Sequence, residues 1–123
     1  MQGRLVSMTE HHHQMLTVAW FRAQYPALAL LLFAIPNGGQ RNPATAAHLN
    51  AEGVVAGIPD LFLAVPMGQD HGLFLEMKTP TGGVSKAQHA AHSSLRAQGY
   101  RVDIARGYEA AKTLLREYLH DAK

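Results

Sequence analysis

Two short apolar stretches, each carrying a carboxylate, constrain this chain more than any other feature of its sequence. Residues 60–65 and 73–78 are predicted to be β-strands, and the short loop between them favours an antiparallel hairpin. Asp60 opens the first stretch, and Glu76 follows three apolar residues of the second. A carboxylate on a buried strand is costly unless something compensates its charge. We therefore expect a sheet that carries a divalent cation at its strand ends.

Lys78 strengthens this expectation because it lies two positions beyond Glu76. Residues two apart on a strand point to the same face, so the two side chains would project together. The carboxylate would hold a metal ion while the ammonium group contacts the same substrate or water. A cap at Asp60 and a surface ion pair would explain the residues without function, but that requires two coincidences on neighbouring strands. The pattern indicates a metal-dependent nuclease.

The composition is that of a single folded domain over residues 1–123, with 47% hydrophobic and 16% charged residues. The absence of cysteine excludes disulfides and thiolate metal sites. The longest apolar run, residues 27–35, is far below the roughly 20 residues that span a bilayer, so no membrane partner is expected.

The net charge of +2 conceals an uneven distribution. If a metal neutralises Glu10, Asp60 and Glu76, then 11 Lys and Arg remain against six Asp and Glu. A basic surface around an acidic hollow suits phosphate binding. An ordinary basic protein would show the same totals, so charge alone leaves both readings open.

Helix-capping residues, prolines, glycines and the hydrophobic pattern together predict the order α-β-α-β-β-α-β-α. This is an α/β domain with a mixed sheet flanked by helices. Helices are expected at about residues 7–25, 43–52, 85–98 and 108–119, and further strands at 28–35 and 100–105.

The first helix and the segment after it carry specific expectations. Ser7 to Glu10 fits a capping box. The apolar face of this helix is then predicted to consist of Met15, Leu16, Ala19 and Trp20. The leucine-rich segment 28–35, between two prolines, is predicted to be a buried strand. Five aromatic residues are expected in the core: Trp20, Phe21, Phe33, Phe62 and Phe74.

A set of motifs extends over nearly the whole chain, from about Glu10 to Leu119. In order they are Ile35-Pro36-Asn37-Gly38-Gly39, Gly53, Gly57-Ile58-Pro59-Asp60-Leu61, Glu76-Met77-Lys78, Gln88 and Gly99-Tyr100-Arg101-Val102. Together they resemble the virus-type replication-repair nuclease (VRR-NUC) domain family of the PD-(D/E)XK superfamily, in its stand-alone phage and bacterial form. The resemblance implies a restriction-endonuclease-like core.

The resemblance also implies roles for individual residues. Asp60, Glu76 and the backbone carbonyl of Met77 would bind Mg²⁺ or Mn²⁺, ions that prefer oxygen ligands. Lys78 would orient or help to deprotonate the attacking water and offset charge in the transition state.

Two further candidates have competing explanations. The resemblance makes Glu10 a further metal ligand, although the predicted cap with Ser7 would also account for it. Gln88 would lie beside Lys78 and act in catalysis, yet it also fits a capping box that begins at Ser85.

A third group is expected to contact DNA: Asn37, Gly38, Gly39, Arg41 and Lys86. The glycines permit a close approach of the backbone to phosphate, but a plain turn and solvated side chains would give the same sequence. His89 and His92, on the same predicted helix as Lys86, are equally compatible with facing solvent. The run of three histidines at 11–13 is assigned no zinc, because consecutive helical residues point about 100° apart.

The function implied by the resemblance is a DNA endonuclease on branched DNA, namely Holliday junction resolution by a homodimer, in the cytoplasm of a bacterial or phage-infected cell. A flap- or restriction-like nuclease without junction preference is the first alternative. A non-catalytic DNA-binding partner domain is the second, and the intact set of Asp60, Glu76 and Lys78 argues against it.

Overall fold

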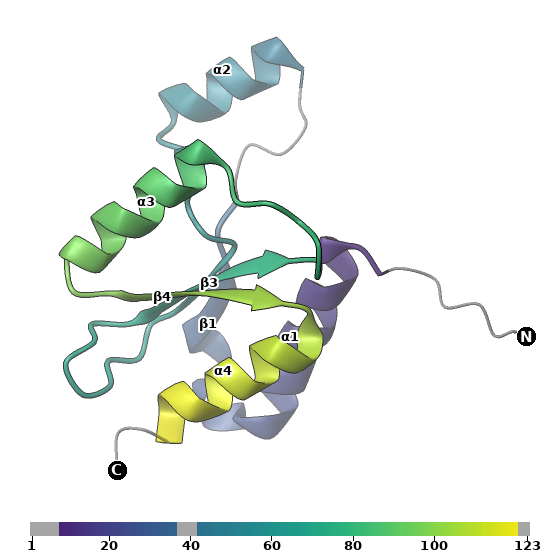
Figure 1. Ribbon diagram of the computed structural model, residues 1–123, viewed down its shortest axis with the longest axis vertical. Coiled ribbons are helices and arrows are strands. Elements are labelled where there is room, and N and C mark those ends of the chain that lie inside the picture. The colour runs from purple at the N-terminus through teal and green to yellow at the C-terminus, as the bar shows by residue number, and fades with distance from the viewer. Residues whose placement is uncertain (1–7, 37–41, 121–123) are drawn as a thin grey trace, which may run out of the picture.

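The computed structural model describes residues 8–36 and 42–120, which form one four-stranded sheet with helices packed on both faces and one helix, α2 (Pro43–Ala51), that stands away from it (Figure 1). In chain order the elements are α1 (Glu10–Gln24), the 3₁₀ helix η1 (Pro26–Leu31), β1 (Leu32–Ala34), α2 (Pro43–Ala51), β2 (Leu61–Leu63), β3 (Leu73–Lys78), α3 (Lys86–Ala97), β4 (Arg101–Arg106) and α4 (Tyr108–His120). Apart from η1, this is the predicted order.

The sheet is mixed, with strand order β1-β2-β3-β4. The predicted hairpin is present, since β2 and β3 pair antiparallel with Leu61 opposite Leu75. β4 is parallel to β3, because α3 carries the chain back across the sheet between them. Helices α1 and α4 lie on one face of the sheet and α3 on the other (Figure 1), so the two faces have different surroundings.

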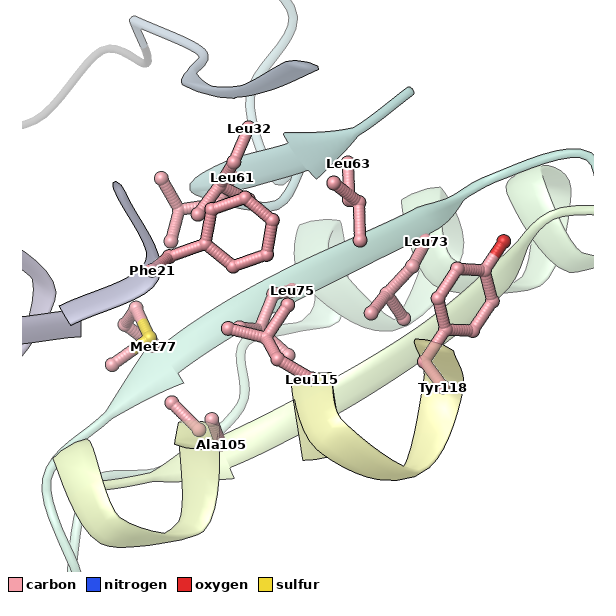
Figure 2. Packing of buried hydrophobic residues seen from close by; sticks show 11 residues of the cluster. Phe21, Leu32, Leu61, Leu63, Leu73, Leu75, Met77, Ala105, Leu115 and Tyr118 are labelled. Carbon is pink, nitrogen blue, oxygen red and sulfur yellow. The ribbon is translucent and has the colours of Figure 1, made fainter. Parts of the chain in front are cut away.

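The hydrophobic core occupies the face under α1 and α4 (Figure 2). Alternate residues of the strands point into it, as the two-residue period requires. Its fully buried members from the sheet and the two helices are Phe21, Leu32, Leu61, Leu63, Leu73, Leu75, Met77, Ala105, Ala111, Leu115 and Tyr118. The intervening residues of β3, which include Glu76 and Lys78, therefore face α3.

The prediction of a buried strand over residues 28–35 is wrong for most of its length. Residues 26–31 form η1, and only Leu32–Ala34 pair with the sheet. Leu30 is 92% exposed. Pro26 fixes a helical φ in the first turn, and the unbranched Leu and Ala that follow lack the preference of branched residues for strands.

The inward face of α1 also differs from the prediction. Its buried residues are Thr17 and Phe21, whereas Met15 and Leu16 are exposed, as is Ala19. The Thr17 hydroxyl donates to the carbonyl oxygen of His13 at 2.8 Å, which satisfies its hydrogen bond inside the core. Thr17 can therefore be buried, although a prediction from apolar residues alone does not place it on the inward face of α1.

Helix α1 begins after a residue that caps it with a side-chain hydrogen bond, but this residue is not the predicted Ser7. The N-cap of α1 is Thr9, whose side-chain oxygen accepts from the backbone N–H of His12 at 3.1 Å. Ser7 lies outside the described residues. At α3 the predicted capping box between Ser85 and Gln88 is present.

Three of the five aromatic residues assigned to the core lie on the opposite face of the sheet. Phe33, Phe62 and Phe74 form a row across β1, β2 and β3, with ring centroids 5.8 and 4.3 Å apart. Phe33, on the edge strand, is 45% exposed. Of the five, Phe21 is fully buried in the core and Trp20 packs against it.

Candidate active site

The two predicted carboxylates meet at one end of the β2–β3 hairpin. Asp60 directly precedes β2, and its Oδ2 accepts a hydrogen bond from the backbone N–H of Met77 at 2.7 Å. That bond connects the start of β2 to the residue that follows Glu76. The carboxyl groups of Asp60 and Glu76 lie close enough to hydrogen bond to each other. The hairpin register thus brings together groups that are far apart in sequence.

Glu76 is almost fully buried, with 2% of its surface exposed. Burial is the main reason that the pKa of this carboxyl rises from 4.5 to about 8. The negative charge of Asp60, its hydrogen bond to Glu76 and the charge of Glu10 raise the pKa further, while Lys78 opposes the rise. Burial, together with the nearby carboxylates, therefore outweighs the opposing effect of Lys78 on this pKa.

Lys78 shares the sheet face of Glu76 and is 7% exposed. Its neighbour is Glu10, at the start of α1. A Cβ atom placed on Gly82 would lie 3.6 Å from both the Glu10 Oε2 and the Lys78 Cδ, so both side chains adjoin the same backbone position. The structure thus brings Glu10 to the edge of the site, where its charge acts on Glu76.

Gln88 makes the predicted cap and also contacts Glu76, a partner that the sequence did not indicate. Its backbone N–H donates to the Ser85 hydroxyl at 3.1 Å, and its Oε1 accepts from the Ser85 backbone N–H at 2.9 Å. Its Nε2 donates to the Glu76 Oε2 at 3.2 Å. One side-chain amide therefore caps α3 with its oxygen and binds the buried carboxylate with its nitrogen.

His92 is a site residue that the sequence reasoning missed. It is 2% exposed, and its Nε2 lies 3.2 Å from the Glu76 Oε1. Burial lowers the pKa of the imidazole, and the positive charges of Arg96, His89 and Lys78 act in the same direction. Its position one helical turn after Gln88 was the available signal, since residues four apart share a helix face.

Arg106 is a second residue that the sequence reasoning did not identify. It ends β4 opposite Lys78. Its Nη1 donates to the carbonyl oxygens of Thr79 at 3.1 Å and Gly82 at 2.6 Å, with a longer contact to Pro80 at 3.4 Å. The guanidinium group thus holds the loop that follows Lys78.

The loop that carries Asp60 touches α3 at Gly57. This glycine has φ +91°, and a Cβ atom here would overlap the carbonyl group of Ala87. Glycine therefore meets two needs at once: a left-handed backbone and a direct approach to the first turn of α3.

The predicted DNA-binding residues are only partly within the described chain. Asn37, Gly38, Gly39 and Arg41 lie outside it. Lys86 is exposed at the start of α3, two positions before Gln88. Among the consecutive histidines, the Nδ1 of His13 accepts from the backbone N–H of Tyr108 at 2.9 Å and so caps α4.

The donor set fits a hard divalent cation. It offers carboxylate oxygens from Asp60 and Glu76, and the raised pKa of Glu76 shows that burial and the negative charge of Asp60 disfavour its ionised form, which a bound cation would offset. The described part of the chain contains no group of three or more His, Cys, Asp or Glu side chains placed to hold a metal. This carboxylate pair would leave further coordination positions to water and phosphate oxygens, as Mg²⁺ prefers.

The mixed sheet, with Glu76 and Lys78 buried and Asp60 beside Glu76, is that of a nuclease of the PD-(D/E)XK type, a type that generally uses divalent metals. The VRR-NUC domain profile matches residues 5–109, and the chain belongs to this family. A solved structure described as a VRR_NUC domain protein is similar, with a TM-score of 0.81 and 25% sequence identity over 94% of this chain and 91% of that one. No curated protein matches. No helix in the described ranges is long and apolar enough to cross a membrane.

Proposed function

We propose that the protein is a Mg²⁺- or Mn²⁺-dependent endodeoxyribonuclease that hydrolyses phosphodiester bonds in structured DNA. The observation that carries this proposal is the contact between the carboxyl groups of half-buried Asp60 and buried Glu76, next to buried Lys78. A domain that only binds DNA gains nothing from burying one carboxylate and placing a second beside it near an anionic ligand.

The roles of the residues follow from their positions. Asp60, Glu76 and the Met77 carbonyl would hold the ion, which when bound polarises the scissile phosphate and acidifies the attacking water. Lys78 orients that water through its ammonium protons and offsets the negative charge that develops on the phosphate. Gln88 holds Glu76 through its amide nitrogen. Glu10 adds negative charge at the rim, where it favours cation entry.

The finer parts of the proposal are junction resolution and a homodimer, at work in the cytoplasm of a bacterial or phage-infected cell. Their support is the family resemblance to stand-alone phage and bacterial members. Resolving a four-way junction requires incisions on two opposed strands, and a symmetric dimer supplies two sites in suitable positions.

Calorimetric titration with Mn²⁺ tests the metal assignment. The wild type should bind, and the Asp60→Ala, Glu76→Ala double variant should not. The control is Glu109→Ala, Glu117→Ala, which removes the same charge from exposed positions on α4. Equal affinity in the wild type and the site variant would contradict the assignment.

Cleavage of linear, flap, Y-shaped and four-way DNA with Mn²⁺ tests the substrate, and light scattering tests the dimer. We expect paired nicks in a cruciform plasmid within one binding event. A dimer that cuts flaps but not junctions would make the protein a flap-type nuclease. A monomer on junction DNA would contradict the resolvase proposal, and a folded protein that binds DNA without cutting any substrate would be a partner domain.

A further inference from the structure

Helix α3 contacts both oxygens of the Glu76 carboxylate from consecutive turns. Gln88 Nε2 donates to Oε2 at 3.2 Å, and four residues later His92 Nε2 meets Oε1 at the same distance. Both contacts come from one face of α3, which is set against the sheet by the parallel crossover from β3 to β4.

The chemistry of a carboxylate gives this two-point contact a consequence. Each oxygen of an ionised carboxylate has two lone-pair sites. One donor on each oxygen fixes the plane of the group and leaves a second lone pair on each oxygen for a cation. Without the contact from His92, Oε1 would lose this restraint and the plane of the carboxylate would be less closely fixed.

We propose that His92 is a positioning residue that donates its Nε2–H to Glu76 and, with Gln88, orients this carboxylate for the divalent ion. The inference rests on the proposed function, since it requires Glu76 to be a metal ligand. His92 itself does not contact the ion or the substrate.

The burial of His92 supports a specific role for its ring nitrogen. An imidazole at 2% exposure loses its hydration, and the contact with Glu76 supplies a compensating hydrogen bond. Three basic side chains act electrostatically on the His92 imidazole: Arg96 and His89 from α3, and Lys78 from β3. The acidic group that His92 faces is Glu76. Hydrogen-bonded residues behind a ligand commonly set metal affinity, with losses of about 10–100-fold on their removal.

The test is Mn²⁺ titration calorimetry on His92→Asn and His92→Gln. The Asn side chain is too short to reach Glu76, so affinity should fall about 10–100-fold. The Gln amide nitrogen extends about as far as the imidazole Nε2, so affinity should return to within a few fold of the wild type. His89→Asn, at an exposed position on the same helix, is the matched control and should leave affinity unchanged.

Each outcome supports or overturns the inference, with thermal unfolding establishing that each variant folds. If the wild type binds Mn²⁺ and His92→Asn binds it equally well, His92 has no positioning role. If His92→Gln binds Mn²⁺ as weakly as His92→Asn, the imidazole ring contributes packing but does not orient Glu76, and the inference is again wrong. If the Asn variant does not fold, His92→Met, which has similar volume and no donor, replaces it with the same expected loss. Absence of Mn²⁺ binding in the wild type would overturn the proposed metal site and this inference with it.

Discussion

The two faces of the sheet use the same strands for different purposes. On β3, Leu73, Leu75 and Met77 point into the core under α1 and α4, while Glu76 and Lys78 lie on the other face, where Glu76 contacts α3. Both sets are buried, yet one buries apolar surface, which stabilises the fold, and the other buries charge, which costs stability. The apolar face supplies the free energy that allows the charged face to exist, so changes to the two faces should have separable effects.

The largest change in stability is expected on the apolar face. Leu75→Ala should lower the free energy of unfolding by about 2–5 kcal/mol, because Leu75 is fully buried and the cavity would be lined by well-packed neighbours. Urea unfolding measures it. A loss below about 1 kcal/mol would mean that this face is not the source of stability.

On the charged face, Lys78→Ala should slow cleavage about 100-fold or more while DNA binding and the fold remain. The measurement is single-turnover cleavage at saturating Mn²⁺, with Lys112→Ala on α4 as the control. A folded variant that cuts at the wild-type rate would show that Lys78 has no part in the mechanism. It would also contradict the assignment of catalysis to the charged face.

The charged face, unlike the apolar face, should make the stability of the fold depend on pH. The folded protein keeps a proton on Glu76 up to about pH 8, whereas the unfolded chain releases it near 4.5. The folded state therefore binds more protons between these values, and this group's contribution to stability falls as pH rises through the window. His92, whose pKa is lowered from 6.5, contributes the opposite slope below that value, so the clearest range is pH 6.5 to 8.

Thermal unfolding of the metal-free protein over that range should show a falling melting temperature. Glu76→Gln, which cannot ionise, should show a flatter profile. Parallel profiles for the two proteins would mean that the raised pKa of Glu76 does not affect folding.

The smallest effects are expected at the helix caps. Ser85→Ala on α3 and Thr9→Ala on α1 remove equivalent N-cap hydrogen bonds on opposite faces, and each should cost about 0.5–2 kcal/mol in urea unfolding. Ser85→Ala keeps the backbone N–H that binds the Gln88 Oε1, so cleavage should change little. A much larger loss at Ser85 would mean that the cap, and not the side chains of α3, organises the charged face.

Much of the fold was predictable, because local chemistry decides it. The hairpin follows from two apolar stretches joined by a short loop, and the start of α3 follows from Ser85 and Gln88. Residues 28–31 were mispredicted as a strand because a short leucine-rich run has no period that separates a helix from a strand. The 3₁₀ turn there depends on Pro26 and on how the chain enters the sheet edge.

The site was predictable to the extent that its residues form a sequence motif. Asp60 and Glu76 lie beside each other and Gln88 contacts Glu76, while the chemical roles of all three remain predictions. His92 and Arg106 were missed because their importance arises from what the fold places opposite them: a buried carboxylate and a set of carbonyl oxygens. His89, on the same helix as His92, is exposed, yet nothing in the sequence distinguishes these two histidines from each other.

The approach of Gly57 to Ala87 has a consequence for how such domains could be recombined. Asp60, Glu76, Lys78, Gln88 and His92 all lie between residues 57 and 92, and the backbone contact near the two ends closes this segment into a loop. A crossover between residues 57 and 87 would join a loop from one parent to a helix from another across a contact that has no room for a methyl group. The segment is therefore the natural unit of exchange, to be transplanted whole or left intact.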